Sequence, residues 1–203
     1  AMWLNPHHER HFFPNALPAQ TNPDDSSLLL TDNGQQRTPN RTEHNLCVVG
    51  SPNRREYDLV ADYLEQYNNT EQSTTARIRF YQFGWGRMPA CMLPWITQYV
   101  VIYGIADYQE YQQKIATTCH AILSLIVPTT HSEYFKGEKK LSGSIVQAAA
   151  NRLPIVLHTD LAKLYERYIP DAITHGDNQE SFNDAIKRLI DRLETQKKQE
   201  SML

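Results

Sequence analysis

The sequence predicts an α/β fold in which a doubly wound parallel sheet of about six strands carries helices on both faces. Two observations lead to this prediction. From residue 46 onward, short apolar runs of strand length alternate with amphipathic stretches of helix length, and such alternation is typical of parallel sheets covered on both sides. The chain has 203 residues, of which 40% are apolar and 21% charged, which is the composition of a globular protein with a buried core.

Each expected strand is a short run rich in apolar residues. The run at 46–50, "LCVVG", is apolar and ends in glycine, and the run at 76–83, "ARIRFYQF", alternates as a strand does. The expected strands are 46–50, 76–83, 99–104, 121–128, 154–158 and 172–176.

Each expected helix lies between two of these runs or after the last. Asp107 is expected to cap the helix that follows it. In the last helix the apolar residues from Phe182 to Leu193 recur at helical spacing, and the basic end of that helix suits the helix dipole. The expected helices are 55–67, 107–119, 141–151, 160–168 and 181–198.

A sheet of this kind is Rossmann-like, and its ligands bind at the carboxyl ends of the strands, near the point where the strand order reverses. The residues that directly follow the strands are therefore the ones to examine. They are 50–55, 82–87, 104–107, 129–134 and 158–160.

The first 45 residues differ from the rest of the chain. They are rich in Asn, Pro, Gln, Thr and His, and their only apolar run is 28–30. A polar arm or interdomain linker is expected at 1–45, and a Rossmann-like domain at 46–203. The "HHERH" at 7–11 departs from H-E-x-x-H, so no metal site is expected there.

Charge and apolar run length exclude several classes of partner. A net charge of −3 gives no reason to expect nucleic acid as the main partner. No run of about 18 apolar residues exists, so no transmembrane segment is expected. The N-terminus also lacks the pattern of a signal peptide.

Three cysteines are few and odd in number, and none forms a C-x-x-C pair. Cys47 lies in an expected core strand, where a free thiol behaves as a small apolar group. The cysteines thus favour the cytoplasm, and a secretory lumen remains the alternative if an upstream signal was removed.

Two loops carry candidate site residues. Gly50 and Ser51 follow the first strand, and Arg54 and Arg55 stand beside them. Arginine binds phosphate through two parallel hydrogen bonds, so this loop is a candidate phosphate site, the alternative being two solvated arginines.

The second loop, "TTHSEYFKGEKK" at 129–140, contains His131 and Glu133. His131 is a candidate acid or base, the alternative being a bystander. No G-x-S-x-G elbow, P-loop, Cys–His protease signature or G-x-G-x-x-G fingerprint is found.

The stretch at 139–158, "KKLSGSIVQAAANRLPIVLH", resembles a motif of the C-terminal, nucleotide-sugar-binding domain of GT-B fold glycosyltransferases. That motif has the form E-G-F-G-x-x-x-x-E-A-x-x-x-G-x-P-V-V. Ala148 matches its alanine, Pro154 its proline, and 155–157 the strand that follows. In the order of strands and helices, the resemblance covers roughly residues 46–198.

The two glutamates of the motif correspond here to Lys139 and Gln147. Gln147 can still hydrogen-bond a ribose hydroxyl, but Lys139 cannot act as a carboxylate. Three alternatives stay open: Glu133 or Glu138 substitutes for it, the branch of the family differs, or the domain no longer catalyses.

The resemblance implies a nucleotide-diphosphate sugar, such as a UDP or GDP sugar, as donor substrate and no other cofactor. Its diphosphate would meet the helix that begins at Ser142, Gly143 and Ser144, where small side chains leave backbone N–H groups open. An N-terminal acceptor-binding domain is expected outside this chain. The alternatives are a non-catalytic pseudo-glycosyltransferase or interaction domain and, less favoured because no acid cluster follows a strand, a flavodoxin-like enzyme.

Overall fold

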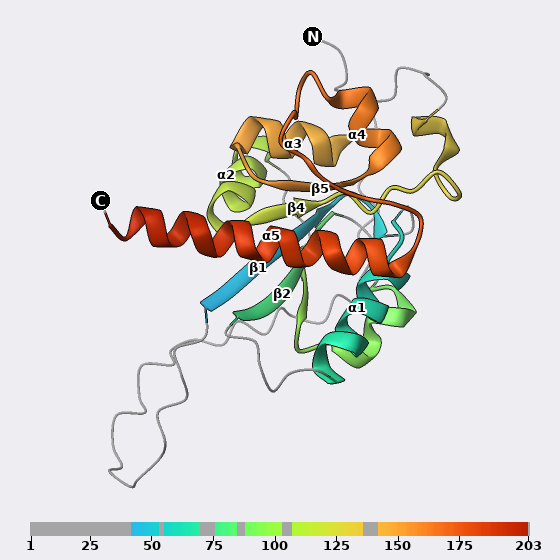
Figure 1. The fold of residues 1–203 in the computed structure, drawn as a ribbon, viewed down its shortest axis with the longest axis horizontal. Helices are drawn as coiled ribbons and strands as arrows, with labels where there is room; N and C mark the ends of the chain where they lie inside the picture. The colour runs from blue at the N-terminus through green and yellow to red at the C-terminus, as the bar shows by residue number, and fades with distance from the viewer. Residues whose placement is uncertain are drawn as a thin grey trace, which may run out of the picture. The chain divides into compact units, whose positions relative to one another are not determined.

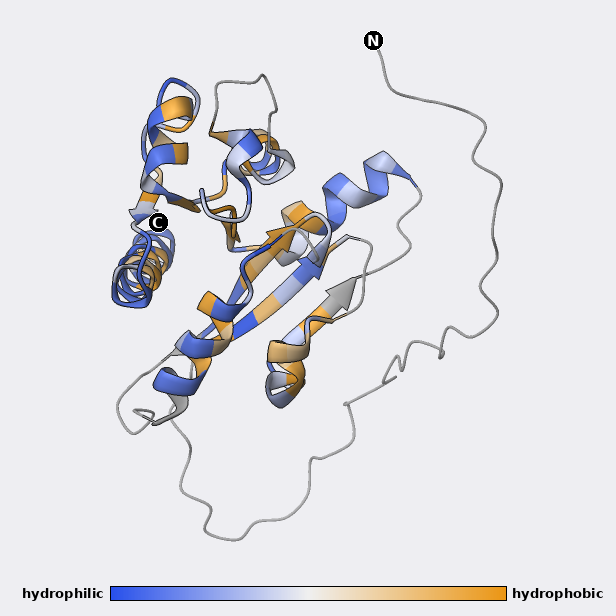
Figure 2. Ribbon diagram, turned by 90° about the vertical axis from the view of Figure 1, so that its right-hand side faces the viewer, coloured by the Kyte–Doolittle hydropathy of each residue, from blue (hydrophilic) through white to orange (hydrophobic). Residues whose placement is uncertain are grey.

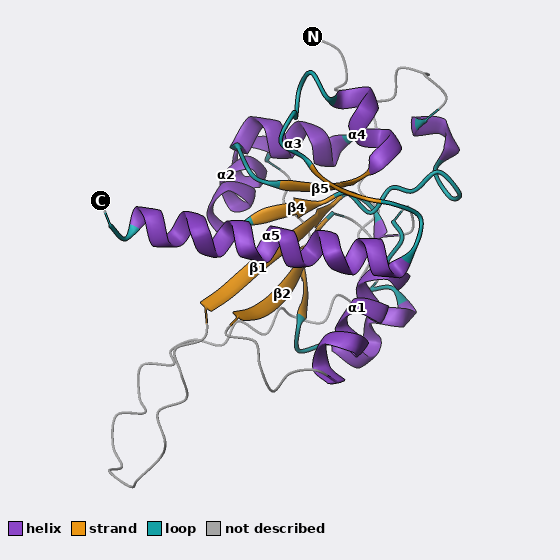
Figure 3. Cartoon of the chain, viewed as in Figure 1, coloured by secondary structure: helices purple, strands orange, loops and turns teal. Residues whose placement is uncertain are grey.

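A computed structural model describes residues 42–52, 55–69, 76–84, 88–102, 107–135 and 142–202. Their strands form one parallel sheet in the order β3-β2-β1-β4-β5-β6 (Figures 1 and 3). The predicted six-stranded, Rossmann-like parallel sheet is thereby confirmed. The strands are β1 (Thr42–Val49), β2 (Ala76–Phe83), β3 (Tyr99–Ile102), β4 (Ala121–Leu123), β5 (Ile155–His158) and β6 (Ile173–His175).

Helices cover both faces of the sheet, as the alternating pattern predicts. Helices α1 and α5 pack on one face, and α2, α3 and α4 pack on the other. The helices are α1 (Asp58–Asn69), α2 (Tyr108–Thr118), α3 (Gly143–Asn151), α4 (Thr159–Tyr165) and α5 (Gln179–Glu200), and the short 3-10 helices are η2 (Ala90–Trp95) and η3 (Ser132–Tyr134).

The core has two halves because successive side chains of a strand point to opposite faces. In β1, Leu46 and Val48 pack toward α1 and α5, whereas Val49 packs toward α2 and α3. Helix α5 buries Phe182 and Leu189 on its inner side. Figure 2 shows this helix nearly end-on, with hydrophobic residues among mostly hydrophilic ones.

The cysteine prediction is wrong for Cys47. The side chain forms a disulfide with Cys119, which directly follows α2. Of the three cysteines, Cys91 is the free one. Both bonded cysteines are buried, so the pair occupies core space that the sequence assigns to a free thiol. The expectation of a cytoplasmic protein depended on free thiols. Because two of the three cysteines are bonded to each other, that basis is lost.

Several element boundaries differ from the predicted ones, among them the starts of β1 and α1 and the end of β4. Strand β1 begins at Thr42 because residues 42–45 pair in parallel with Ala76–Arg79 of β2. Helix α1 begins at Asp58, and the backbone N–H of Glu56 ahead of it donates to Leu125. Strand β4 ends at Leu123, although residues 124–127 remain buried.

None of the described helices has the length and the apolar composition that crossing a bilayer takes.

Candidate functional site

The strand order reverses between β1 and β4. The chain passes outward from β1 to β2 and β3, then returns beside β1 and passes outward again through β4, β5 and β6. We call the edge where the strands end, at Val49, Phe83, Leu123, His158 and His175, the carboxyl edge. In open parallel sheets of this kind, the crevice outside the carboxyl ends at such a reversal is the place where ligands bind.

Two glycines bring the backbone after β1 against the end of β2. Gly50 has φ +112° and donates its N–H to the carbonyl of Phe83 over 2.8 Å. An added Cβ on Gly84, which has φ +152°, would collide with the carbonyl oxygen of Gly50. That same oxygen accepts a hydrogen bond from the buried side chain of Gln82, whose Oε1 has no partner among the described residues. The tight contact explains why glycine stands at both positions.

Arg55 turns its guanidinium back onto the end of β1. Nη2 and Nε donate to the carbonyl oxygen of Val49 over 2.7 and 3.2 Å. These two bonds satisfy the last carbonyl of β1, and Arg55 has further interaction partners. Ser51 is half-buried directly after Gly50. Arg54, the other arginine that the sequence proposes for phosphate, lies outside the described residues.

Three buried serines connect the start of α3 to the end of β4. Ser142 and Ser144 share a hydrogen bond of 2.7 Å between their hydroxyls, and Ser144 donates to Ser124 over 3.0 Å. Ser124 directly follows β4. The hydroxyls are therefore turned into the protein, and Ser142, at the capping position, makes no side-chain bond to the helix backbone.

The first turn of α3 consequently has open backbone donors. No described residue accepts a hydrogen bond from the N–H of Gly143 or Ser144, and no acid lies in this turn. Gly143 is exposed, and a Cβ placed on it would meet nothing within 4 Å. The positive end of the helix dipole and its N–H groups together favour an anion at this point.

Gln147 lies one turn further along α3 and is buried. Its side-chain oxygen accepts a hydrogen bond of 3.3 Å from Asn151, which also reaches Gln112 on α2 at 3.3 Å. Asn151 thus links Gln147 to Gln112 of α2. The bond to Asn151 occupies one part of the amide that the sequence assigns to a ribose hydroxyl.

His131 stands after β4 and is buried, with its neighbour Thr130 as partner. The Thr130 hydroxyl donates to a carboxylate oxygen of Glu56 over 3.1 Å and lies 2.7 Å from Nδ1 of His131. Of the acids proposed to replace the missing glutamate, Glu133 is half-buried in η3 and has interaction partners. Glu138 lies outside the described residues.

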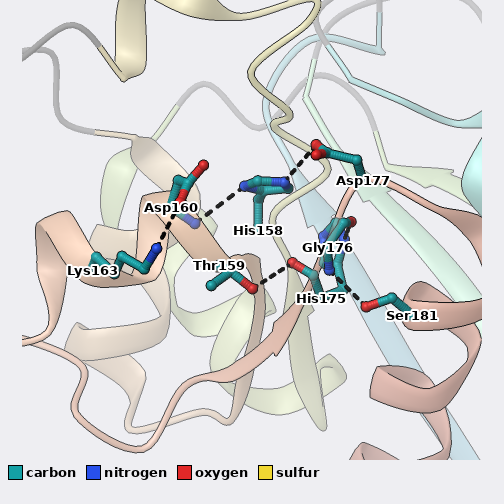
Figure 4. A network of polar contacts seen from close by, with 8 residues as sticks. All are labelled: His158, Thr159, Asp160, Lys163, His175, Gly176, Asp177 and Ser181. Atoms are coloured by element: carbon teal, nitrogen blue, oxygen red, sulfur yellow. Dashed lines mark hydrogen bonds and ion pairs between the residues drawn. The ribbon is translucent and has the colours of Figure 1, made fainter.

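A pair of histidines, His158 and His175, occupies the carboxyl ends of β5 and β6 (Figure 4). Nδ1 of His158 accepts the N–H of Asp160 over 3.2 Å, which leaves Nε2 as the protonated nitrogen that donates to Asp177 over 2.9 Å. The His158 ring meets Phe135 edge-on, with centroids 5.8 Å apart. His158 thereby caps α4 and ties three loops of the carboxyl edge together.

His175 fills the space between His158 and Phe182, at centroid distances of 5.5 and 5.3 Å. Its Nδ1 donates to the carbonyl of Gly176 over 2.8 Å, and its buried Nε2 has no partner among the described residues. Burial lowers the pKa of His175, and the neighbouring His158 lowers it further, although the Gly176 carbonyl and Asp177 oppose this shift. The imidazole is therefore held neutral in the core.

Some of these residues follow from the sequence and others do not. The strand-end rule selects Thr130 and His158, because both lie in segments that it names. Glu56 stands one residue beyond the named segment after the first strand, and Asp177 follows a strand for which no segment is named. Within the part of the chain that the structure describes, no group of three or more potential ligands is arranged to hold a metal ion.

Comparisons with known proteins give structural matches alone. The sequence matches no family model and has no significant match to a curated protein. Solved structures similar to this chain include TarM, at 13% identity and TM-score 0.48 over 81% of this chain and 30% of that chain. AviGT4, a glycosyltransferase involved in avilamycin A biosynthesis, matches at 13% identity and TM-score 0.41 over 79% and 51%.

The glycosyltransferase SnogD from Streptomyces nogalater matches at 14% identity and TM-score 0.35 over 81% of this chain and 44% of that chain. In each case this chain spans about half of the matched chain or less.

Proposed function

We propose that this chain is the nucleotide-sugar donor-binding domain of a GT-B type glycosyltransferase, with the acceptor-binding domain supplied from outside these residues. The observation that carries the proposal is the open first turn of α3. Its N–H groups lie beside the end of β4, where the strand order reverses, and the Ser144–Ser124 bond holds them there. A diphosphate is an anion of the size and charge that such a turn favours.

The backbone after α3 agrees with the sequence resemblance. Arg152 occupies the position where the glycosyltransferase motif has its third and last glycine, two residues before Pro154. Its φ is +54°, in the left-handed region that glycine favours, and no other non-glycine residue that the structure describes has a positive φ. Ala148, the motif's alanine, is buried against the sheet. These two positions thus have the backbone and the packing that the motif residues would need.

The roles of the candidate residues follow from this geometry. Gly143 and Ser144 would donate backbone N–H groups to the diphosphate. Gly50 leaves room for the Arg55 guanidinium, and Gly84 leaves room for the carbonyl of Gly50. Arg55, because it closes the end of β1, would shape the site, whereas a direct phosphate contact would fall to other donors.

The decisive experiment changes Gly143, which has room for a side chain. Gly143→Asp places a carboxylate at the first position of α3, where it suits the helix dipole but repels a diphosphate. Gly143→Asn has nearly the same shape without the charge. We expect UDP or GDP to raise the melting temperature of the wild type and of Gly143→Asn, and to leave Gly143→Asp unchanged. Stabilisation of all three proteins alike, or of none by any nucleoside diphosphate at millimolar concentration, would contradict the proposal.

A second candidate function is a domain of the same fold that binds a nucleotide but transfers no sugar. One observation favours it: the two motif glutamates are replaced, and Gln147 is hydrogen-bonded to Asn151 within α3. Incubation of the protein with UDP-sugars and GDP-sugars distinguishes the two functions. Slow release of free nucleoside diphosphate by the wild type, and none by Gly143→Asp, would favour the transferase. Nucleotide binding with no release would favour the non-catalytic domain.

A further inference from the structure

Glu56, Thr130 and His131 form a chain of hydrogen bonds at the carboxyl edge. Glu56 comes from the segment before α1, and its own backbone N–H donates to the carbonyl of Leu125 over 3.0 Å. Thr130 and His131 come from the segment between β4 and η3. These hydrogen bonds therefore join the loop after β1 to the loop after β4, the two loops that flank the reversal of strand order.

The direction of the hydrogen bonds in this chain follows from the donors available. Thr130 has one hydroxyl proton, and an ionised carboxylate can only accept. With the hydroxyl donating to Glu56 over 3.1 Å, the 2.7 Å contact to His131 requires that Nδ1 of the imidazole carries the proton. The reverse order would leave the carboxylate without this charge-assisted bond, which is the stronger of the two.

When the imidazole of His131 is neutral, the proton on Nδ1 leaves the lone pair on Nε2. Among the described residues, nothing donates a hydrogen bond to this nitrogen. The ring is buried and lies against Tyr134, with centroids 6.4 Å apart, so its orientation is restricted. An acceptor fixed in this way suits a hydroxyl donor, and a nucleotide sugar carries several hydroxyls.

We propose that Thr130 and Glu56 are positioning residues that hold His131 in the Nδ1–H tautomer, so that its Nε2 accepts a hydrogen bond from a hydroxyl of the bound sugar nucleotide. The inference rests on the proposed function for the identity of the ligand. The tautomer itself depends on this chain's own residues and is measured without ligand.

The tautomer is tested by long-range ¹H–¹⁵N correlation spectra of the histidine side chains, with His131 assigned through His131→Gln. We expect Nδ1–H in the wild type and in Thr130→Ser, which keeps the hydroxyl. In Glu56→Leu the freed hydroxyl turns to donate to Nδ1, so the proton moves to Nε2. A wild type with Nε2–H, or a Glu56→Leu variant that keeps the wild-type tautomer, overturns the proposal.

The ligand is tested by titration with UDP and GDP, using variants that leave the charge of the site unchanged. Thr130→Val removes the hydroxyl at nearly constant shape, and we expect it to weaken binding about threefold to tenfold, the effect of one hydrogen bond. Thr130→Ser should restore wild-type affinity. Equal affinity of the Val and Ser variants overturns the assignment of a ligand hydroxyl to Nε2.

The two levels of the proposal fail differently. If the wild type binds neither nucleotide, the proposed function and the ligand contact are both overturned, and the spectra still decide whether Glu56 and Thr130 set the tautomer. If the wild type binds but the Glu56→Leu spectra are unchanged, the proposed function stands and the positioning role falls. Circular dichroism of each variant confirms that a change reflects the site and not unfolding.

Discussion

The three histidines of the carboxyl edge show how single hydrogen bonds assign different roles to the same side chain. His158 accepts a backbone N–H on Nδ1, and its other nitrogen is committed to Asp177. His175 donates from Nδ1 to the Gly176 carbonyl and keeps a buried, unpartnered Nε2. His131 contacts a threonine that is itself held by a carboxylate. His158 and His175 therefore brace the fold, and His131 is the one suited to a ligand.

Burial of His175 predicts a loss of stability in acid. Burial is the largest cause of its lowered pKa. Below the ordinary histidine pKa of about 6.5 the unfolded chain takes up a proton that folded His175 does not, so the free energy of unfolding falls as pH falls. Stability is fully present above that value and declines as pH drops through the window between the ordinary pKa and the lowered one.

The measurement compares urea unfolding of the wild type and His175→Phe between pH 8 and pH 5. His44 and His120 also have pKa values lowered by burial, so both proteins should lose stability in acid. The variant should lose less, by at most about 1.4 kcal/mol per pH unit, which is the slope for one proton. Identical slopes for the two proteins would show that His175 is protonated equally well in the folded state.

At the scale of elements, the sequence predicts the type and order of structure better than its boundaries. Asp107 caps α2 by accepting the N–H of Gln109 over 3.1 Å, as its position before an amphipathic stretch predicts. The stripe from Phe182 to Leu193 is buried in α5. Both features depend on neighbours within a few residues of the chain, which a sequence pattern contains.

The residues ahead of α1 have partners outside the local pattern. The periodic pattern extends back to residue 55, yet the helix begins at Asp58, and ahead of it Arg55 bonds to Val49 and the N–H of Glu56 to Leu125. The same contacts change the interpretation of Arg55. A guanidinium beside a glycine loop predicts phosphate binding, and no local pattern reveals that a strand-end carbonyl lies within its reach.

Arg55→Ala should therefore destabilise the protein in the absence of any ligand. The change removes both hydrogen bonds to the Val49 carbonyl, and we expect the free energy of unfolding to fall by about 1 to 3 kcal/mol. Arg77→Ala, on an exposed position of β2, is the matched control and should change it by less than about 0.5 kcal/mol. If the two variants are equally stable, the bond to Val49 contributes nothing to the stability of the fold.

Across the whole molecule, the two ends of the parallel sheet differ in what they present. The open first turn of α3 lies at the carboxyl edge, together with His131, His158 and His175. The opposite edge receives the C-termini of α2, α3 and α5 around a hollow of about 650 Å³, with His44 and Glu43 from the start of β1. Helix N-termini favour anions and C-termini favour cations. The direction of the helices thus favours anions at the carboxyl edge.

The disulfide is the feature of the whole molecule that the sequence predicts least well. Cys47 and Cys119 are 72 residues apart and face each other because β1 and the end of α2 share one side of the sheet. An odd number of cysteines without regular spacing contains no information on that packing. Only the arrangement of strands, in which β1 lies beside β4, brings the end of α2 over the middle of β1.

Loss of this disulfide should lower the stability of the whole fold. A cross-link over such a separation removes entropy from the unfolded chain, and we expect Cys47→Ala with Cys119→Ala to lose about 2 to 4 kcal/mol. Cys91→Ser is the control, because burial raises the pKa of that half-buried thiol to about 11 and keeps it unreactive. Guanidinium unfolding with and without dithiothreitol measures both effects. Reductant should lower the stability of the wild type and of Cys91→Ser alike and leave that of the double variant unchanged. If reductant does not change the stability of the wild type, the disulfide contributes nothing to the free energy of unfolding.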